Sequence, residues 1–165
     1  GIWRQPPQGV IDVTVVMQEN LWYIIGLITT DGNLSPNGRN INITSKDRAL
    51  LIAVKKALGL SNKIGRKANG SSKEKKYSVL QIGDKKFYEY LLSIGLTPRK
   101  SLTLEKLNVP DAYFLDFLRG VIDGDGSILH WVHRTNHNTQ WSLSVVSGSP
   151  IFLNWLKEKL NLSVA

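Results

Sequence analysis

Two stretches of the chain recur in the same order, and this repeat constrains the fold more than any other feature. Residues 24–32 read IIGLITTDG and residues 118–126 read LRGVIDGDG, so a Gly, an Asp and the Gly after that Asp return at the same spacing. Further along, residues 41–61 match residues 143–163 at six identical positions, which include Ser45 with Ser147 and Leu51 with Leu153. Repeated segments indicate two copies of one structural unit, which we expect to be related by a pseudo-twofold axis.

The two copies differ in length. The first continues after Ser61 through further strand and helix patterns, whereas the second ends two residues after Ser163. We therefore expect an N-terminal extension over residues 1–17, a first repeat over 18–109 and a second repeat over 110–165 that is incomplete at its C-terminus. Either a longer gene product or a second chain would complete the second repeat.

Hydrophobic periodicity and turn residues predict the order of elements. Helices are expected over residues 18–31, 47–58, 84–94, 111–125 and 149–160, and strands over 40–44, 62–68, 76–82, 127–134 and 140–146. A Pro-Asn-Gly turn precedes the strand at 40–44, and residues 97–110 are expected to form a connector between the repeats. The pattern corresponds to a mixed α/β, or α+β, protein made of αββαββα units.

The composition favours a polyanionic partner. The chain has 165 residues and a formal net charge of +8, and nucleic acid is the commonest partner of so basic a protein. The absence of cysteine excludes disulfides and thiolate metal sites. With no long apolar run and no signal pattern at the N-terminus, we expect a cytoplasmic (nucleoid-associated) or organellar protein that is not secreted and has no membrane partner. The missing initial Met indicates processing or an excised segment.

Asp31 and Asp125 are expected in the last turn of their helices, where a carboxylate is electrostatically unfavourable. The helix C-terminus carries partial negative charge, which costs an acidic side chain a few tenths of a kcal/mol to about 1 kcal/mol. A divalent cation held by both carboxylates and by nearby helix-end carbonyls would remove that cost, and Mg²⁺ prefers such oxygen ligands. Whether Thr30, just before the first Asp, adds a ligand stays open. A simple Asp-Gly turn is the alternative explanation.

Gly26 and Gly120 occupy the middle of the same two helices. Glycine costs about 1 kcal/mol there relative to Ala, which is acceptable where another backbone must approach closely. Helices packed at these glycines would bring Asp31 and Asp125 together. Paired carboxylates that hold metal across a phosphodiester are suited to metal-assisted hydrolysis by water.

The segments IIGLITTDG and LRGVIDGDG resemble the two signature helices of LAGLIDADG homing endonucleases of the two-motif, monomeric type. The resemblance covers nearly the whole chain after residue 18, and it implies signature helices at the centre, antiparallel β-sheet saddles for DNA, and cleavage of double-stranded DNA at a long site. It also implies that Asp31 and Asp125 are catalytic metal ligands for Mg²⁺, or for Mn²⁺ or Ca²⁺ in its place. Thr29 departs from the motif, which usually has Asp at this position. The corresponding residue of the second copy, Asp123, matches the motif. The resemblance further implies an intron-encoded or other mobile genetic element as the source.

A connector lysine is another feature of that family. The segment GLTPRKSLTL is similar to the connector, which assigns the role to Lys100. A lysine near the scissile phosphate can polarise water or neutralise developing charge. A solvated connector lysine is the alternative, and the counterpart of Lys100 in the second copy would lie beyond Ala165.

A DNA-reading surface is expected on the strands. If Ile41 and Ile43 face the core, their polar neighbours face outward and can hydrogen-bond base edges, while basic residues contact phosphates. The expected DNA-binding residues are Arg39, Asn40, Asn42, Thr44, Lys46, Lys63, Arg66, Lys67, Lys75, Lys76, His130, His133, Arg134, Gln140, Ser142 and Ser144. The histidines are not expected to hold zinc, because no Cys or carboxylate lies near them in the sequence. The tryptophans are expected to pack in the core or on the hairpin.

Three functions are therefore open. The first is a metal-dependent, sequence-specific DNA endonuclease. The second is a non-cleaving nucleic-acid-binding protein on the same fold, either an intron RNA maturase or a DNA-binding regulator. The third is a generic basic α/β domain. Retention of both Asp residues favours the endonuclease, because a protein that only binds nucleic acid does not need them.

Overall fold

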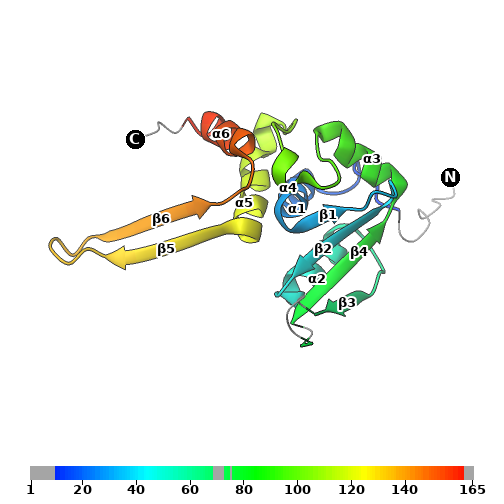
Figure 1. The fold of residues 1–165 in the computed structure, drawn as a ribbon, viewed down its shortest axis with the longest axis horizontal. Helices are drawn as coiled ribbons and strands as arrows, with labels where there is room; N and C mark the ends of the chain where they lie inside the picture. The colour runs from blue at the N-terminus through cyan, green and yellow to red at the C-terminus, as the bar shows by residue number, and fades with distance from the viewer. Residues whose placement is uncertain (1–9, 69–72, 75, 162–165) are drawn as a thin grey trace.

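The structure is a computed structural model that describes residues 10–68, 73–74 and 76–161. The first repeat holds helices α1 (Gln18–Asp31), α2 (Arg48–Ala57) and α3 (Lys85–Ile94), and strands β1 (Gly32–Leu34), β2 (Asn40–Ser45), β3 (Ile64–Lys67) and β4 (Tyr77–Gly83). The second holds α5 (Phe114–Asp125), β5 (Gly126–Val132), β6 (Thr139–Val145) and α6 (Pro150–Lys159). Helices and antiparallel strands mix in both repeats, so the expected α+β class is confirmed, and α1 and α5 stand side by side at the centre (Figure 1).

The first sheet has the strand order β1-β2-β4-β3, with every neighbouring pair antiparallel. Ile41 and Ile43 on β2 are fully buried, whereas Asn40, Asn42 and Thr44 are only half-buried. Because alternate residues of a strand point to opposite faces, one face of this sheet forms core and the other presents polar side chains. The outward orientation expected for the polar residues of β2 is therefore confirmed.

Helix boundaries follow from capping residues. Asp47, Asp84 and Ser149 each accept a hydrogen bond from the backbone N–H three residues on, at the starts of α2, α3 and α6. Such N-caps satisfy donors that have no partner inside the helix. Gly95 ends α3 in the left-handed conformation, with φ of 114°, which suits a residue without Cβ.

Two elements were not expected from the sequence. Strand β1 has only three residues, two of them Gly and Asn, so it carries no strand propensity and exists through its pairing with β2. The connector is not irregular throughout, because it contains the short helix α4 (Lys100–Thr103). The helix expected from residue 111 begins as a 3₁₀ turn at Asp111–Tyr113 before α5. No helix in the described part of the chain is both long enough and apolar enough to cross a membrane.

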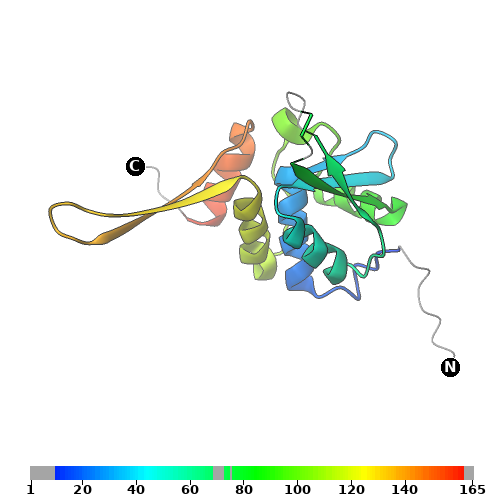
Figure 2. The ribbon, with the colours of Figure 1, turned by 90° about the horizontal axis from the view of Figure 1, so that it is seen from below.

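The second repeat is built around one long hairpin. Strands β5 and β6 pair over seven residues each and project away from the rest of the molecule in both views (Figures 1 and 2). At its base, α6 packs on α5 through a cluster of aromatic rings formed by Phe114, Phe117, Phe152 and Trp155. The second repeat thus has a compact base and a two-stranded arm.

The tryptophans divide between core and hairpin. Trp22 and Trp155 are buried in the core, and Trp131 and Trp141 lie on the hairpin, where Trp141 contacts the ring of His130 at a centroid distance of 5.0 Å. Trp3 lies outside the described residues. The hairpin tryptophans remain largely exposed, because nothing in the described part of the chain covers the arm.

Candidate metal and nucleic-acid site

Helices α1 and α5 contact each other backbone to backbone at Gly26 and Gly120. A Cβ atom placed on Gly26 would lie 2.1 Å from the carbonyl oxygen of Phe117, and one on Gly120 would lie 2.0 Å from the carbonyl oxygen of Tyr23. Real Cβ atoms do not approach an oxygen so closely, so only glycine fits at either position. The close approach predicted from these mid-helix glycines is present.

The crossing brings the two Asp residues to the same end of the helix pair. Asp31 and Asp125 are the last residues of α1 and α5. A Cβ on Gly124 would lie 3.5 Å from Oδ2 of Asp31 and would overlap the hydroxyl of Thr30, so the end of α1 contacts the residue beside Asp125. Asp31 is half-buried and Asp125 is exposed, which makes the pair asymmetric.

The electrostatics of Asp31 reflect this environment. Burial, together with the nearby negative charge of Asp125, raises the pKa of Asp31 to about 6, although the positive charge of Lys100 acts in the opposite direction. Like charges at close range and loss of solvent both disfavour an ionised carboxylate. A carboxyl group whose pKa is raised in this way is suited to binding a cation, because the cation would favour the ionised carboxylate.

Lys100 lies beside the two Asp residues. It is the first residue of α4, it is buried, and its Nζ donates a hydrogen bond to the carbonyl oxygen of Gly32 at the end of α1. Burial lowers the pKa of Lys100, while the charges of Asp125 and Asp31 act to raise it. The preceding Arg99 adopts the left-handed conformation, with φ of 59°, at the turn from which Lys100 enters the site.

Lys100 and Asp125 line a cleft of about 290 Å³ between the repeats, and Asp31 directly follows Thr30 in its wall. Its walls come from the end of α1, from α4, from Asp125 and from the loop after β6, and comprise Thr29, Thr30, Lys100, Ser101, Leu104, Asp125, Val146, Ser147 and Gly148. Ser147 was not predicted as a site residue, but the sequence offered a signal for it, because it is identical to Ser45 at the matching position of the repeat. Ser101 and Gly148 carried no such signal.

Thr29 and Asp123, which occupy matching motif positions, do not join the carboxylate pair. The hydroxyl of Thr29 is buried and donates to the carbonyl oxygen of Ile25 at 2.8 Å. Asp123 is exposed and accepts a hydrogen bond of 2.7 Å from the hydroxyl of Tyr23, whose ring also lies under the guanidinium of Arg119. The departure of Thr29 from the motif therefore leaves the pair intact.

The donor set of the cleft fits a hard divalent cation. Within the described ranges no three His, Cys, Asp or Glu residues gather as a metal cluster, so the two Asp carboxylates are the acidic ligands available. Mg²⁺ typically binds one or two carboxylates, keeps several waters and uses substrate phosphates for its remaining ligands. Asp31 and Asp125 can therefore hold such an ion, with oxygen atoms of a bound nucleic acid completing the coordination.

The register of the first sheet sorts the expected DNA-binding residues by face. Asn42 pairs across to Asn33 and Gln81, two polar residues that sequence reasoning missed and that share its outward face. Lys67 pairs with Tyr77, whose ring lies under the ammonium of Lys46 at 5.6 Å, so both lysines belong to that face or its rim.

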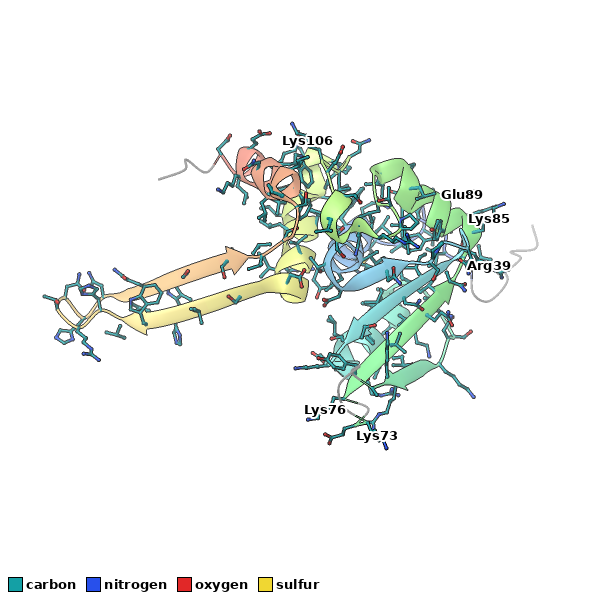
Figure 3. The ribbon with its side chains drawn as sticks, in the orientation of Figure 1. Arg39, Lys73, Lys76, Lys85, Glu89 and Lys106 are labelled. Carbon is teal, nitrogen blue, oxygen red and sulfur yellow. The ribbon has the colours of Figure 1, made fainter. Side chains whose placement is uncertain are left out.

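Other expected residues of the first repeat are placed differently. Arg66 pairs with the buried Ser78 and so points to the opposite face from Lys67. Lys63 lines a cleft of about 620 Å³ with residues of α2, again away from the polar face. Arg39 and Lys76 lie at opposite ends of the sheet (Figure 3). Lys75 lies outside the described residues.

The hairpin likewise has two distinct faces. Ser127 pairs with Ser144, with their hydroxyls 2.7 Å apart, and the pairs Leu129–Ser142 and Trp131–Gln140 continue the same face. His130 lies on the other face with Trp141, so it is separated from Gln140, Ser142 and Ser144. His133 and Arg134 lie at the tip, where the backbone of His133 bonds to that of Asn138.

Comparison with known proteins matches part of the chain to one family. Residues 18–95 match the sequence profile of the LAGLIDADG-like domain. No curated protein matches the chain. Among solved structures, full-length WhiA from Thermatoga maritima is 16% identical with a TM-score of 0.48, and the alignment covers 87% of this chain but only 43% of WhiA.

Structures of the homing endonuclease I-DmoI are similar to a comparable degree. Its mesophilic variants are 15% identical with a TM-score of 0.45, over 87% of this chain and 75% of theirs. A single-site variant of I-DmoI in complex with its target DNA and Mn is 16% identical with a TM-score of 0.46, over 87% of this chain and 74% of that one. The profile match identifies residues 18–95, the first repeat, as a LAGLIDADG-like domain.

Proposed function

We propose that this protein is a site-specific endonuclease that cuts double-stranded DNA by metal-dependent hydrolysis of phosphodiester bonds. The observation that supports this most is the position of Asp31 and Asp125 at one end of two helices packed glycine to glycine, beside the buried Lys100. Two carboxylates close together at helix C-termini are electrostatically unfavourable, and a bound cation would remove that cost.

The residues of the cleft have separable roles in this proposal. Asp31 and Asp125 hold the divalent ion and position it against a phosphate. When bound, the ion supplies electrostatic stabilisation of the attacking and leaving oxygens. Lys100 donates to the carbonyl of Gly32 and presents its ammonium group near both carboxylates, where it can neutralise charge that develops on the phosphate.

Recognition of DNA is assigned to the polar faces of the strands. Side chains such as Asn42 and Gln81 stand in a row on the first sheet and can reach base edges, while Lys46 and Lys67 can contact phosphates. On the arm, Ser142, Ser144 and Gln140 share one face, and Arg134 lies at its tip. Phosphate contacts account for affinity and base-edge contacts for sequence preference.

Cleavage of a plasmid library of candidate sites, in Mg²⁺ or in EDTA, tests this function. We expect cutting only with Mg²⁺, and loss of cutting in Asp31→Asn and Asp125→Asn with DNA binding retained. Asp123→Asn is the matched control, because Asp123 is on the same helix but bonds to Tyr23 outside the pair. If no site is cut by the wild-type protein, or if the control loses cutting equally, the proposal fails.

A non-cleaving nucleic-acid-binding protein is the second candidate. The asymmetry of the pair favours it, since Asp31 is half-buried near Lys100 whereas Asp125 is exposed. The same plasmid library distinguishes the endonuclease from the non-cleaving protein. A non-cleaving protein binds its site equally in EDTA and in Mg²⁺ and leaves both DNA strands intact. Inclusion of structured RNA in the binding assay separates an RNA maturase from a DNA-binding regulator.

A further inference from the structure

A second cleft lies in the first repeat, away from the pair of Asp31 and Asp125. It encloses about 620 Å³ between one face of α2 and the segment that leads into β3. Its described lining consists of four basic and three aliphatic residues, which are Arg48, Lys55, Lys56, Lys63, Ile52, Leu60 and Ile64. Both elements belong to the first repeat, so this α2 cleft does not depend on the arm or on α6.

The α2 cleft opens on the side of the first sheet that carries the helices. Ile64 pairs with Leu80, which is fully buried, so Ile64 points to the inner face on which α2 packs. Arg66, two residues further along β3, points the same way and adds positive charge to that side of the strand. Asn42 and Gln81 lie on the opposite face, the one proposed to contact DNA. The two faces can therefore be occupied at the same time.

The positive charges of the α2 cleft are not neutralised inside the protein. Among the described residues no salt bridge reaches any of its four basic side chains, whereas Lys85 and Lys106 outside it pair with acidic neighbours. Its described lining contains no carboxylate. Like charges gathered around one hollow repel each other, and the hollow focuses their field on an incoming anion. An anionic group that enters the cleft would relieve this repulsion.

The floor of the α2 cleft is aliphatic, which restricts the chemistry of its occupant. Arg48, Ile52 and Lys56 follow one another at intervals of four residues and so share one face of α2. Ile52 is 49% exposed between these two cations, beside the half-buried Ile64 and the buried Leu60. Exposed apolar side chains rimmed by charge typically mark an interaction site. An occupant that carries both apolar and negative groups matches this surface.

Nucleic acid matches only the charged part of it. Unpaired bases stack on aromatic rings, and the described lining of the cleft has none. The phosphates of a duplex would leave the aliphatic floor uncovered. An amphipathic helix with an apolar stripe between acidic residues matches both parts. Arg48 and Lys56 are about 12 Å apart along α2, which is about two turns of such a helix.

From these observations we infer that the α2 cleft docks an acidic amphipathic helix of a partner protein. The apolar stripe of that helix covers Ile52 and Ile64, and its carboxylates pair with Lys56 on one wall and Lys63 on the other. A second copy of the chain is not the partner, because two chains of charge +8 repel each other. The inference is independent of DNA cleavage, since the cleft lies on the opposite side of the sheet from the proposed DNA contacts.

Fluorescence anisotropy of the full chain with a synthetic probe tests the inference. The probe is a labelled helical peptide of about 14 residues with Leu at every third or fourth position between Glu residues. A second probe has the same composition in scrambled order. We expect the patterned probe to bind at least about tenfold more tightly than the scrambled probe. An excess of unlabelled duplex DNA should leave the patterned probe bound.

Two substitutions in the cleft have matched controls on α3. Ile52→Gln should weaken binding of the patterned probe about fivefold, whereas Leu92→Gln, at a residue 41% exposed, should change it less than about twofold. Lys63→Gln should also weaken binding about fivefold, and Lys85→Gln, which removes the same charge beside Glu89, should not (Figure 3). All four positions are exposed, so the fold should be kept, and thermal unfolding checks this.

Several outcomes would overturn the inference. They are an absence of saturable binding, equal binding of the scrambled probe, and equal losses in the cleft variants and their controls. Displacement of the patterned probe by duplex DNA or by structured RNA would assign the cleft to nucleic acid instead. A dimer in light scattering that Ile52→Gln disrupts would assign it to a second copy of the chain.

Discussion

At the scale of single residues, the cleft depends on a carboxylate kept in an unfavourable position. Asp31 lies at a helix C-terminus, is half-buried and faces the charge of Asp125, and the charge of Lys100 partly offsets these effects. The repetition of Asp-Gly made both Asp residues identifiable from the sequence. Their unequal burial was not, because it depends on how α4 and the loop after β6 close over one helix end.

We expect Asp31→Asn to stabilise the metal-free protein at pH 7 while it abolishes cleavage. The folded-state pKa of about 6 is above the ordinary value of 3.8, so ionisation destabilises the fold at neutral pH and stability rises as pH falls from about 6 towards 4. With allowance for partial solvent exposure, the gain is about 1 kcal/mol in free energy of unfolding. Denaturant unfolding at pH 7 and pH 4 checks this: the variant should be the more stable at pH 7 and nearly equal to wild type at pH 4.

Lys100→Met should lower the cleavage rate about a hundredfold with little change in DNA affinity, because the Met side chain keeps the buried stem but removes the ammonium group. Lys106→Met is the control, since Lys106 is an exposed connector lysine that pairs with Glu158 at 3.6 Å. Single-turnover rates with saturating protein give the comparison. Equal rates in the two variants would show that Lys100 has a structural role only.

At the scale of elements, periodicity and capping residues predicted all the helices except α4 and all the strands except β1. Both exceptions are short, and both are fixed by contacts with distant residues: β1 by its pairing with β2, and α4 by the bond from Lys100 to Gly32. The contact between α1 and α5 was predictable, because glycine in the middle of a helix needs a packing reason.

Gly26→Ala should destabilise the protein by about 3 kcal/mol, at the upper end for overpacking, because the new Cβ meets the backbone of α5 rather than a movable side chain. Gly65→Ala serves as the control, since its Cβ would lie 3.3 Å from a side-chain methyl of Val79 and 3.9 Å from the nearest backbone atom, an ordinary contact. The control should change the free energy of unfolding by less than about 1 kcal/mol. Equal losses measured by thermal or urea unfolding would contradict a backbone-to-backbone crossing.

The strand register predicts different roles for two neighbouring basic side chains on β3. Lys67 shares the polar face with Tyr77, whereas Arg66 points the other way with Ser78. We therefore expect Lys67→Gln to reduce the slope of log K against log salt by about 0.9, the value for one phosphate contact, and Arg66→Gln to leave the slope unchanged. DNA titrations at several salt concentrations measure both, and a larger effect of Arg66 would place the DNA on the other face.

At the scale of the whole molecule, the two repeats share one plan and differ in extent. The first forms a four-stranded sheet with helices over its inner face, while the second extends a two-stranded arm into solvent (Figure 2). The sequence predicted the shared plan and the polar outer face. It did not predict how far the arm stands free, because exposure depends on what packs against it.

Replacement of residues 133–137 at the tip of the arm by a two-residue turn should shorten the DNA segment protected from nuclease on one side only. The arm projects from the second repeat alone, so only that half of the contact loses His133 and Arg134. Footprinting on a fixed target site, with both ends labelled, distinguishes the sides. If the protected segment shortened equally at both ends, the arm would not contact the DNA on the side of the second repeat alone.

The glycine contact between α1 and α5 has a consequence for how such proteins can be recombined. These two helices make most of the contacts between the repeats, and at their crossing the contact is between main chains, which every sequence shares. Halves taken from different relatives should therefore join, provided that each keeps its glycine and the small residues around it. Target preference, which depends on the outer faces of the strands, could then be changed one half at a time without redesign of the contact between α1 and α5.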